Sequence, residues 1–262
     1  MGAFTTIEFS VDTRGVATLR LNRPAVHNAM NGVMYDEARS VVSRCESDSS
    51  IRVLVLTAAG ASFCSGGDLK YQQEQASRPQ SERIKEASKL ACWLRELDTL
   101  SKPVIGRING PAYAGGLGLV SVCDIAIGCD DAQFAVTEAR LGLLPGMISP
   151  YLVRRIGEPF ARRLFLTGRR ITAAEAVTMG LLSVSVPADR LDAAVQEEVD
   201  MVLKCAPGSL AANKRLIEYV STHGSADNFV YTVDRVAEMW AWDEAEEGIK
   251  SFLEKRKPAW VS

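Results

Sequence analysis

Two glycine-rich segments are the part of this sequence best suited to chemistry. They cover residues 62–70 and 109–119, and each follows a short apolar run, at residues 51–56 and 104–108. Glycine permits close approach of the backbone, so N–H groups from both segments can point at one ligand oxygen. Two such donors stabilise negative charge developing on a carbonyl oxygen, by roughly 3 to 4 kcal/mol per donor. The pattern predicts an oxyanion hole.

The glycine segments do not match the common phosphate-binding patterns. Gly116-Leu-Gly118 is followed by no third glycine at the dinucleotide-binding spacing, and no Gly-Lys-Ser/Thr sequence follows. Packing explains either segment alone, since strand-to-helix turns in many α/β proteins use glycine for that purpose. Together, the two segments favour an oxyanion hole over a phosphate cradle.

Glu138 is the main candidate for acid–base chemistry. It lies in the apolar sequence FAVTEARLGLLPG, after a strand-like run and before a turn. Such surroundings raise the pKa of a carboxyl group and suit it to move protons near neutral pH. The alternative is a surface glutamate or an ion-pair partner of Arg140. For Asp68 and Asp124, capping or loop hydrogen bonds are a better explanation than chemistry.

The sequence indicates neither a nucleophile nor a metal site. Tyr113, His27 and Cys64 each carry a reactive group, but no Ser-His-Asp order or G-x-S-x-G motif accompanies them. The six cysteines include no C-x-x-C pair, and the chain has two histidines. Neither a zinc site nor a disulfide framework is therefore expected.

The composition is that of an ordinary globular protein, with 47% hydrophobic and 24% charged residues among 262. A net charge of -2 argues against nucleic acid as a partner, because phosphate binding requires clustered Lys and Arg. The N-terminus has no basic segment followed by an apolar one, and no apolar stretch reaches the roughly 18 residues of a membrane span. We expect no membrane partner and a cytoplasmic location.

The order of predicted elements indicates an α/β fold with parallel strands. Strands are expected at residues 16–21, 51–56, 104–108, 124–128, 133–136 and 182–186. Helices are expected at about 30–47 and 81–98, and a capping box at Thr172 begins another. Two strand segments per helical layer suggest a ββα spiral at residues 1–187. The remainder, 188–262, has a helical pattern to its end, including the charged run 254–257, and is expected to form an appended domain.

Short motifs along nearly the whole chain resemble the enoyl-CoA hydratase/isomerase (crotonase) superfamily. They are LNRP at 21–24, NAM at 28–30, FCSGGDL at 63–69, ING at 108–110, GG at 115–116, CDI at 123–125, LTG at 166–168 and FLEKRK at 252–257. The resemblance implies a crotonase-type ββα spiral core with a C-terminal helical trimerisation domain. It also implies a homo-oligomer, a trimer or a hexamer.

The resemblance further implies roles for individual residues. It assigns the oxyanion-hole N–H groups to Gly67 and Gly115, and it matches Glu138 to the second of two glutamates that flank the enoyl thioester in family hydratases. The first glutamate position falls on Gly118. Residues expected to bind the acyl-CoA substrate are Arg23, Ala25, Val26, Gly66, Asp68, Leu69 and Gly118, with Phe252 and Lys255 reaching a neighbouring subunit's site. Coenzyme A is part of this substrate, and no separate cofactor is expected.

Residues 115–127, which include Gly118, and residues 142–151 look most like bacterial hydratases of glutaconyl-type thioesters in leucine or acyclic terpene breakdown. A second glutamate would repel a carboxylated substrate in a low-dielectric pocket, and a branch would use volume that Gly118 leaves free. The predicted function is hydration of a branched, carboxylated enoyl-CoA by Glu138 alone. The alternatives are isomerase, thioester hydrolase, dehalogenase or decarboxylase chemistry, or a non-catalytic acyl-CoA-binding subunit.

Overall fold

The fully buried strand β3 (Val53–Ala58) lies inside a six-stranded sheet of the computed structural model, which describes residues 4–261. The sheet order is β1-β2-β3-β4-β6-β9, with β1 antiparallel to β2 and every other pair parallel. The other strands are β1 (Ile7–Val11), β2 (Val16–Leu21), β4 (Val104–Ile108), β6 (Ile125–Cys129) and β9 (Val184–Val186). The apolar run of β3 reflects a parallel sheet covered on both faces.

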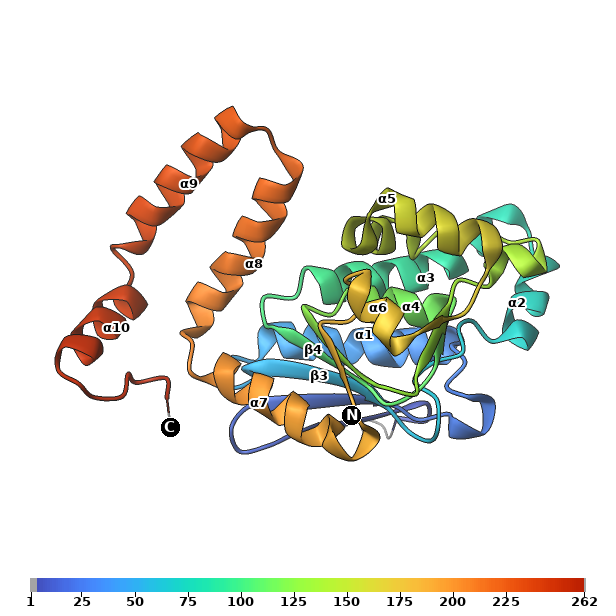
Figure 1. Ribbon diagram of the computed structural model, residues 1–262, viewed down its shortest axis with the longest axis horizontal. Coiled ribbons are helices and arrows are strands. Elements are labelled where there is room, and N and C mark those ends of the chain that lie inside the picture. Colours follow the sequence, from blue (N-terminus) through green and yellow to red (C-terminus); the bar gives the residue numbers. More distant parts are fainter. Residues whose placement is uncertain (1–3, 262) are drawn as a thin grey trace.

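Helices cover both faces of this sheet (Figure 1). On one face lie α1 (Gly32–Ser47), α3 (Gln80–Asp98), α4 (Gly115–Ser121), α5 (Ser149–Thr167) and α6 (Ala173–Thr178). On the other face lies α7 (Leu191–Leu203), which buries Leu191, Val195, Val199 and Val202 in the same core. No helix among residues 4–261 is both long enough and apolar enough to span a bilayer.

A second, three-stranded sheet joins β5 (Ala112–Tyr113), β7 (Gln133–Ala135) and β8 (Ile171–Thr172). The short strands β5 and β7 follow the long strands β4 and β6, and the predicted ββα spiral is confirmed. The predicted capping box is also confirmed, because the Thr172 hydroxyl accepts from the backbone N–H of Glu175 while the Glu175 carboxylate accepts from that of Thr172. Short 3-10 helices are η1 (Pro24–Val26), η2 (Glu138–Leu141) and η3 (Ala188–Arg190).

Two helical details differ from the sequence prediction. Helix α2 (Leu69–Ala76) was not predicted; it buries no residue and so lacks the apolar stripe by which helices are recognised. Its N-cap is Asp68, whose carboxylate accepts from the N–H groups of Lys70 and Tyr71. The final helix α10 (Asp243–Leu253) ends before the charged run 254–257, and Lys255 has a left-handed φ of 53°.

The C-terminal helices leave the core as an extended arm (Figure 1). The arm consists of α8 (Pro207–Thr222), α9 (Ser225–Met239) and α10, and neither α8 nor α9 contains a buried residue. Because α7 packs under the sheet, the structural separation falls after α7 and not at the predicted residue 188. The arm exposes large apolar side chains, including Phe229 at 70%, Trp240 at 75% and Phe252 at 83%.

The buried amide of Asn28 braces the loops that follow β2 and β3. Its Nδ2 donates to the carbonyls of Ala59 at 2.8 Å and Ser62 at 2.9 Å, and its Oδ1 accepts from the N–H of Arg23 at 2.8 Å. The Met30 N–H then donates to the Gly66 carbonyl at 2.8 Å. These bonds fix the first glycine turn against the loop after β2.

Candidate active site

The two glycine turns lie in direct contact. Because β3 and β4 are parallel neighbours, the segments that follow them emerge at the same edge of the sheet. Cys64 and Ala112 form a parallel bridge, and the Tyr113 N–H donates to the Cys64 carbonyl at 2.8 Å. Gly66 has a φ of 100°, and a Cβ placed on it would lie 2.8 Å from the Cβ of Ala114. The absent side chain of Gly66 lets the turns meet.

The predicted oxyanion-hole glycines face one cavity. Gly67 and Gly115 both line it, and neither N–H donates a hydrogen bond to any group within residues 4–261. Gly115 is the first residue of α4, where an N–H has no partner within the helix. Ala114 precedes it with φ 49° and ψ −121°, a conformation that costs an alanine on the order of 1–3 kcal/mol. The local strain thus accompanies an outward-facing N–H.

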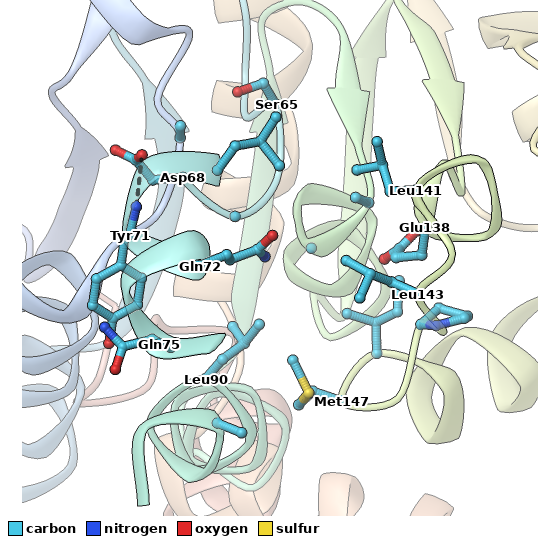
Figure 2. Close-up of a pocket in the computed structure, with 18 of the residues that line it drawn as sticks. Ser65, Asp68, Tyr71, Gln72, Gln75, Leu90, Glu138, Leu141, Leu143 and Met147 are labelled. Atoms are coloured by element: carbon cyan, nitrogen blue, oxygen red, sulfur yellow. Dashed lines mark hydrogen bonds between the residues drawn. The ribbon is translucent and has the colours of Figure 1, made fainter. Parts of the chain in front are cut away.

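The cavity has a volume of about 850 Å³ and is mostly aliphatic on one side (Figure 2). That wall is formed by the segment after β7 and includes Leu141, Leu143, Leu144, Met147 and Ile148. The opposite wall consists of α2 and α3, with Tyr71, Gln72, Gln75 and Leu90 among its residues. The two walls present different surfaces to the cavity, one aliphatic and one largely polar.

Glu138 differs from the two other carboxylates that line the cavity. Although burial opposes the effect, hydrogen bonds from Arg23 and from the N–H groups of Tyr71 and Lys70 lower the pKa of Asp68. The Tyr71 hydroxyl and the Lys89 ammonium lower the pKa of Glu86. Burial raises the pKa of Glu138, and backbone N–H groups offset this only in part. Of the three, only Glu138 is shifted in the direction that suits a proton carrier near neutral pH.

Glu138 is positioned at the start of η2, immediately after β7 and Thr137. Figure 2 shows it between Leu141 and Leu143, across the cavity from Gln72. Its Oε2 is buried and has no hydrogen-bond partner among the described residues. Among residues 4–261, Glu138 forms no ion pair with Arg140. The alternative that Glu138 serves as an ion-pair partner of Arg140 therefore does not apply.

Gly118 is buried in α4 and does not line the cavity. A Cβ placed on it would lie 2.5 Å from Cγ2 of Ile148 and 3.3 Å from Cδ1 of Leu94. The expectation that Gly118 leaves free volume for an acyl branch is therefore wrong. Ile148, at the cavity wall, fills the space beside this glycine.

The predicted coenzyme A residues fall into two groups. Arg23, Val26, Asp68 and Leu69 line the cavity. Ala25 is exposed in η1 beside Val26, and Gly66 is buried within the first glycine turn, where it meets Ala114. Phe252 and Lys255 lie at the end of the C-terminal arm, and this chain does not bring them to its own cavity. Residues 4–261 contain no group of three His, Cys, Asp or Glu side chains placed to hold a metal ion.

Several cavity residues escaped the sequence analysis. Tyr71, Gln72 and Gln75 belong to the unpredicted α2, while Arg83 and Glu86 lie on α3. The helix expected at about 81–98 carries apolar residues at helical spacing from Ile84 to Leu97. The first of them do not face the core, since Ile84 is 60% exposed and Ala87 lines the cavity. The polar first turns of α3, which precede an amphipathic stretch, were the signal in the sequence that could have identified these residues.

Comparison with known proteins assigns the family. The family model described as "Enoyl-CoA hydratase/isomerase" matches residues 12–262. The chain is 34% identical over 255 residues to "Enoyl-CoA hydratase EchA19" of Mycobacterium tuberculosis, covering 95% of this chain and 94% of that protein. It superposes with a TM-score of 0.94 on an enoyl-CoA hydratase from Shewanella pealeana, at 33% identity, covering 98% and 96% of the two chains. The same score holds for AtuE of Pseudomonas aeruginosa, at 34% identity, covering 98% and 100%.

The fold and the site define a hydratase-type enzyme. The chain belongs to the enoyl-CoA hydratase/isomerase family, as its motifs predict.

Replacing Gly66 by Ala should separate the two turns. The new Cβ would press on Ala114 and would lie 3.5 Å from the Gly115 nitrogen, so we expect kcat for enoyl-CoA turnover to fall roughly 100-fold, as when one oxyanion donor is lost. Steady-state kinetics measures this. Gly180→Ala is the matched control, because Gly180 has a similar φ of 78° but a Cβ there meets nothing closer than 3.6 Å. Equal kinetic effects of both substitutions would contradict the explanation.

Glu138→Gln should stabilise the protein at high pH. The folded-state pKa of Glu138 is raised, so the folded chain holds this proton more tightly, and stability is lost as pH rises through that pKa. The Gln variant escapes this loss. We expect the Tm of the variant to exceed that of the wild type at pH 8, and the difference in Tm to disappear towards pH 4. Thermal unfolding measured over this pH range tests the expectation. The exposed Glu197→Gln is the control, and a lower Tm for Glu138→Gln at pH 8 would refute the assignment.

Proposed function

We propose that this enzyme adds water across the α,β double bond of a branched, carboxylated enoyl-CoA. The substrate type is that of 3-methylglutaconyl-CoA or isohexenylglutaconyl-CoA. The observation that carries the proposal is the position of Glu138, a carboxyl group with a raised pKa in the same aliphatic cavity as two unpaired N–H groups. Relatives over the full length bear the name enoyl-CoA hydratase.

In the proposed reaction the thioester oxygen accepts hydrogen bonds from the N–H groups of Gly67 and Gly115. Glu138, ionised, takes a proton from water as the water oxygen bonds to the β carbon. The electron pair of the double bond moves onto the thioester as an enolate, whose charge the two N–H groups stabilise. The same carboxyl group then returns the proton to the α carbon. One water is consumed, and no separate cofactor takes part.

The cavity supports a bulky acyl group. Leu141, Leu143 and Leu144 are each more than half exposed in this chain and line the cavity. Covering them with a hydrocarbon branch would remove apolar surface from water, which is favourable by about 25 cal/mol per Å². A small linear acyl group would leave most of this wall uncovered. We therefore expect the enzyme to prefer branched acyl groups over short linear ones.

Isomerisation of the double bond is the second candidate. Ile148 occupies the space beside Gly118, the position matched to the first family glutamate, so Glu138 alone faces the acyl group from that side. One carboxylate suffices to move a proton between the α and γ carbons of an enoyl thioester, since the enolate is held in both directions by the same N–H groups.

The C-terminal arm supports a homo-oligomer, a trimer or a hexamer. Phe229, Val233, Val236 and Trp240 lie at helical spacing on one side of α9, and all are exposed. Contiguous apolar surface of this kind marks an interface between protein chains. In the assembly, Phe252 and Lys255 would reach the acyl-CoA site of a neighbouring copy. A cytoplasmic location belongs to the same proposal.

The substrate assignment is tested with purified enzyme and three thioesters. We expect hydration of 3-methylglutaconyl-CoA and isohexenylglutaconyl-CoA, with kcat/KM for crotonyl-CoA at least tenfold lower. Glu138→Gln should reduce turnover by at least about 100-fold while leaving the Kd for the saturated thioester within severalfold. Hydration is monitored by the loss of absorbance of the conjugated enoyl thioester, and mass spectrometry detects the added water.

The same panel separates the alternatives. Fast crotonyl-CoA hydration with neither branched substrate accepted would refute the substrate class. Turnover of a β,γ-unsaturated thioester to its conjugated isomer without added water would indicate the isomerase. Binding of all thioesters without any product would indicate a non-catalytic subunit, and full activity of Glu138→Gln would move the chemistry to another residue.

The oligomer is tested by charging the exposed face of α9. Phe229→Asp together with Val233→Asp should lower the mass measured by light scattering from that of an oligomer to that of one chain, because a buried unpaired carboxylate strongly opposes association. The exposed Asp234→Asn is the control. A wild-type protein that is monomeric at micromolar concentration would contradict the proposed assembly.

A further inference from the structure

One face of α3 leads away from the predicted oxyanion hole along the cavity. Arg83, Glu86, Ala87 and Leu90 all line the cavity and follow the spacing of one helical face. Leu90 marks the inner end, since its Cδ2 lies 3.7 Å from the Cβ position of Gly115. Arg83 is seven residues earlier, about 10 Å along the helix axis at 1.5 Å per residue. An acyl group held at Gly115 would extend along this face towards Arg83.

The charges along this path leave a positive excess at its outer end. Asp68 is paired with Arg23 at 3.0 Å. The Glu86 carboxylate accepts from the Tyr71 hydroxyl and lies 3.4 Å from the Lys89 ammonium. Among residues 4–261, the cavity-lining Arg83 forms no ion pair, even with Glu86 one turn away. Its guanidinium is an uncompensated charge on α3, and the Lys70 ammonium at the start of α2 is the other cavity-lining cation on that wall without an ion pair among the described residues.

Gln75 adds a polar group without a partner to the same wall of the cavity. Its side-chain amide nitrogen and oxygen are both buried, and neither has a hydrogen-bond partner among the described residues. Gln75 lines the cavity from the end of α2, and residues 77–79 connect it to the first turn of α3, which holds Arg83. Buried amides in folded proteins are nearly always paired, so an orphan beside a ligand cavity calls for a ligand.

We propose that Arg83, assisted by Gln75, binds a carboxylate at the far end of the acyl group. A guanidinium pairs with a carboxylate through two parallel N–H donors, and the Gln75 amide nitrogen supplies a further one. A five-carbon backbone spans part of the distance from Gly115, and the long arginine side chain spans the rest. This inference rests on the proposed function, because it identifies the group that selects the carboxylated substrate.

The test is equilibrium binding of two saturated, unreactive thioesters. 3-Methylglutaryl-CoA and isovaleryl-CoA differ only in the terminal carboxylate, so calorimetry isolates its contribution. We expect the wild type to bind 3-methylglutaryl-CoA about tenfold or more tightly than isovaleryl-CoA. Arg83→Gln should abolish that preference and leave the Kd for isovaleryl-CoA unchanged, while Gln75→Met should reduce the preference severalfold. Arg78→Gln is the matched control, because Arg78 is exposed, pairs with Glu82 at 3.8 Å and lies outside the cavity.

Three outcomes would overturn the subsite. They are equal binding of both thioesters by the wild type, an equal loss of affinity for both in Arg83→Gln, and loss of the preference in Arg78→Gln. The second outcome would mean that Arg83 binds the coenzyme A phosphates. Failure of the proposed hydration is recognised separately, since a wild type that prefers 3-methylglutaryl-CoA through Arg83 but hydrates no enoyl thioester retains the subsite and loses the reaction.

Discussion

The close contact of two glycine turns is the constraint on which the site depends. Parallel pairing of β3 with β4 brings both turns to one sheet edge, and only a residue without a side chain fits where Gly66 touches Ala114. Asn28 holds the first turn from behind through its three hydrogen bonds. The N–H groups of Gly67 and Gly115 can therefore converge, at the cost of a strained Ala114.

The pKa of Glu138 is set by what surrounds its carboxyl group. Asp68 and Glu86 are neutralised by Arg23 and Lys89 and serve the walls of the cavity. Glu138 has no cationic partner within residues 4–261, so burial dominates its pKa. The unpaired carboxylate of Glu138 lowers the stability of the folded chain, as is common where a charged group must remain available to a substrate. A single such group moves one proton at a time, which both hydration and double-bond isomerisation permit.

Helices α2 and α3 show how one hairpin serves both packing and recognition. The inner half of α3 buries Trp93, Leu94 and Leu97 in the core, while its first turns face the cavity. Helix α2 has no fully buried residue, although its Tyr71 packs against the core. Its polar side chains line the cavity, so substitutions here can change the cavity wall at little cost to folding. The arm of α8 to α10 is likewise separate from the core and exposes large apolar residues.

The sequence alone determined the spiral fold and the positions of strands such as Val16–Leu21 and Val104–Ile108, because periodicity and glycine turns are local signals. An apolar setting, also a local signal, made Glu138 the candidate for acid–base chemistry. Distances between distant segments were decided only by the tertiary structure. The missing side chain of Gly118 suggested free space, yet Ile148 fills it from a segment 30 residues away. Helix α2 has no apolar stripe and could not be recognised by its period. Arg83 has no ion-pair partner among the described residues because the nearby carboxylates pair with other groups, and such pairing is decided only in the folded chain.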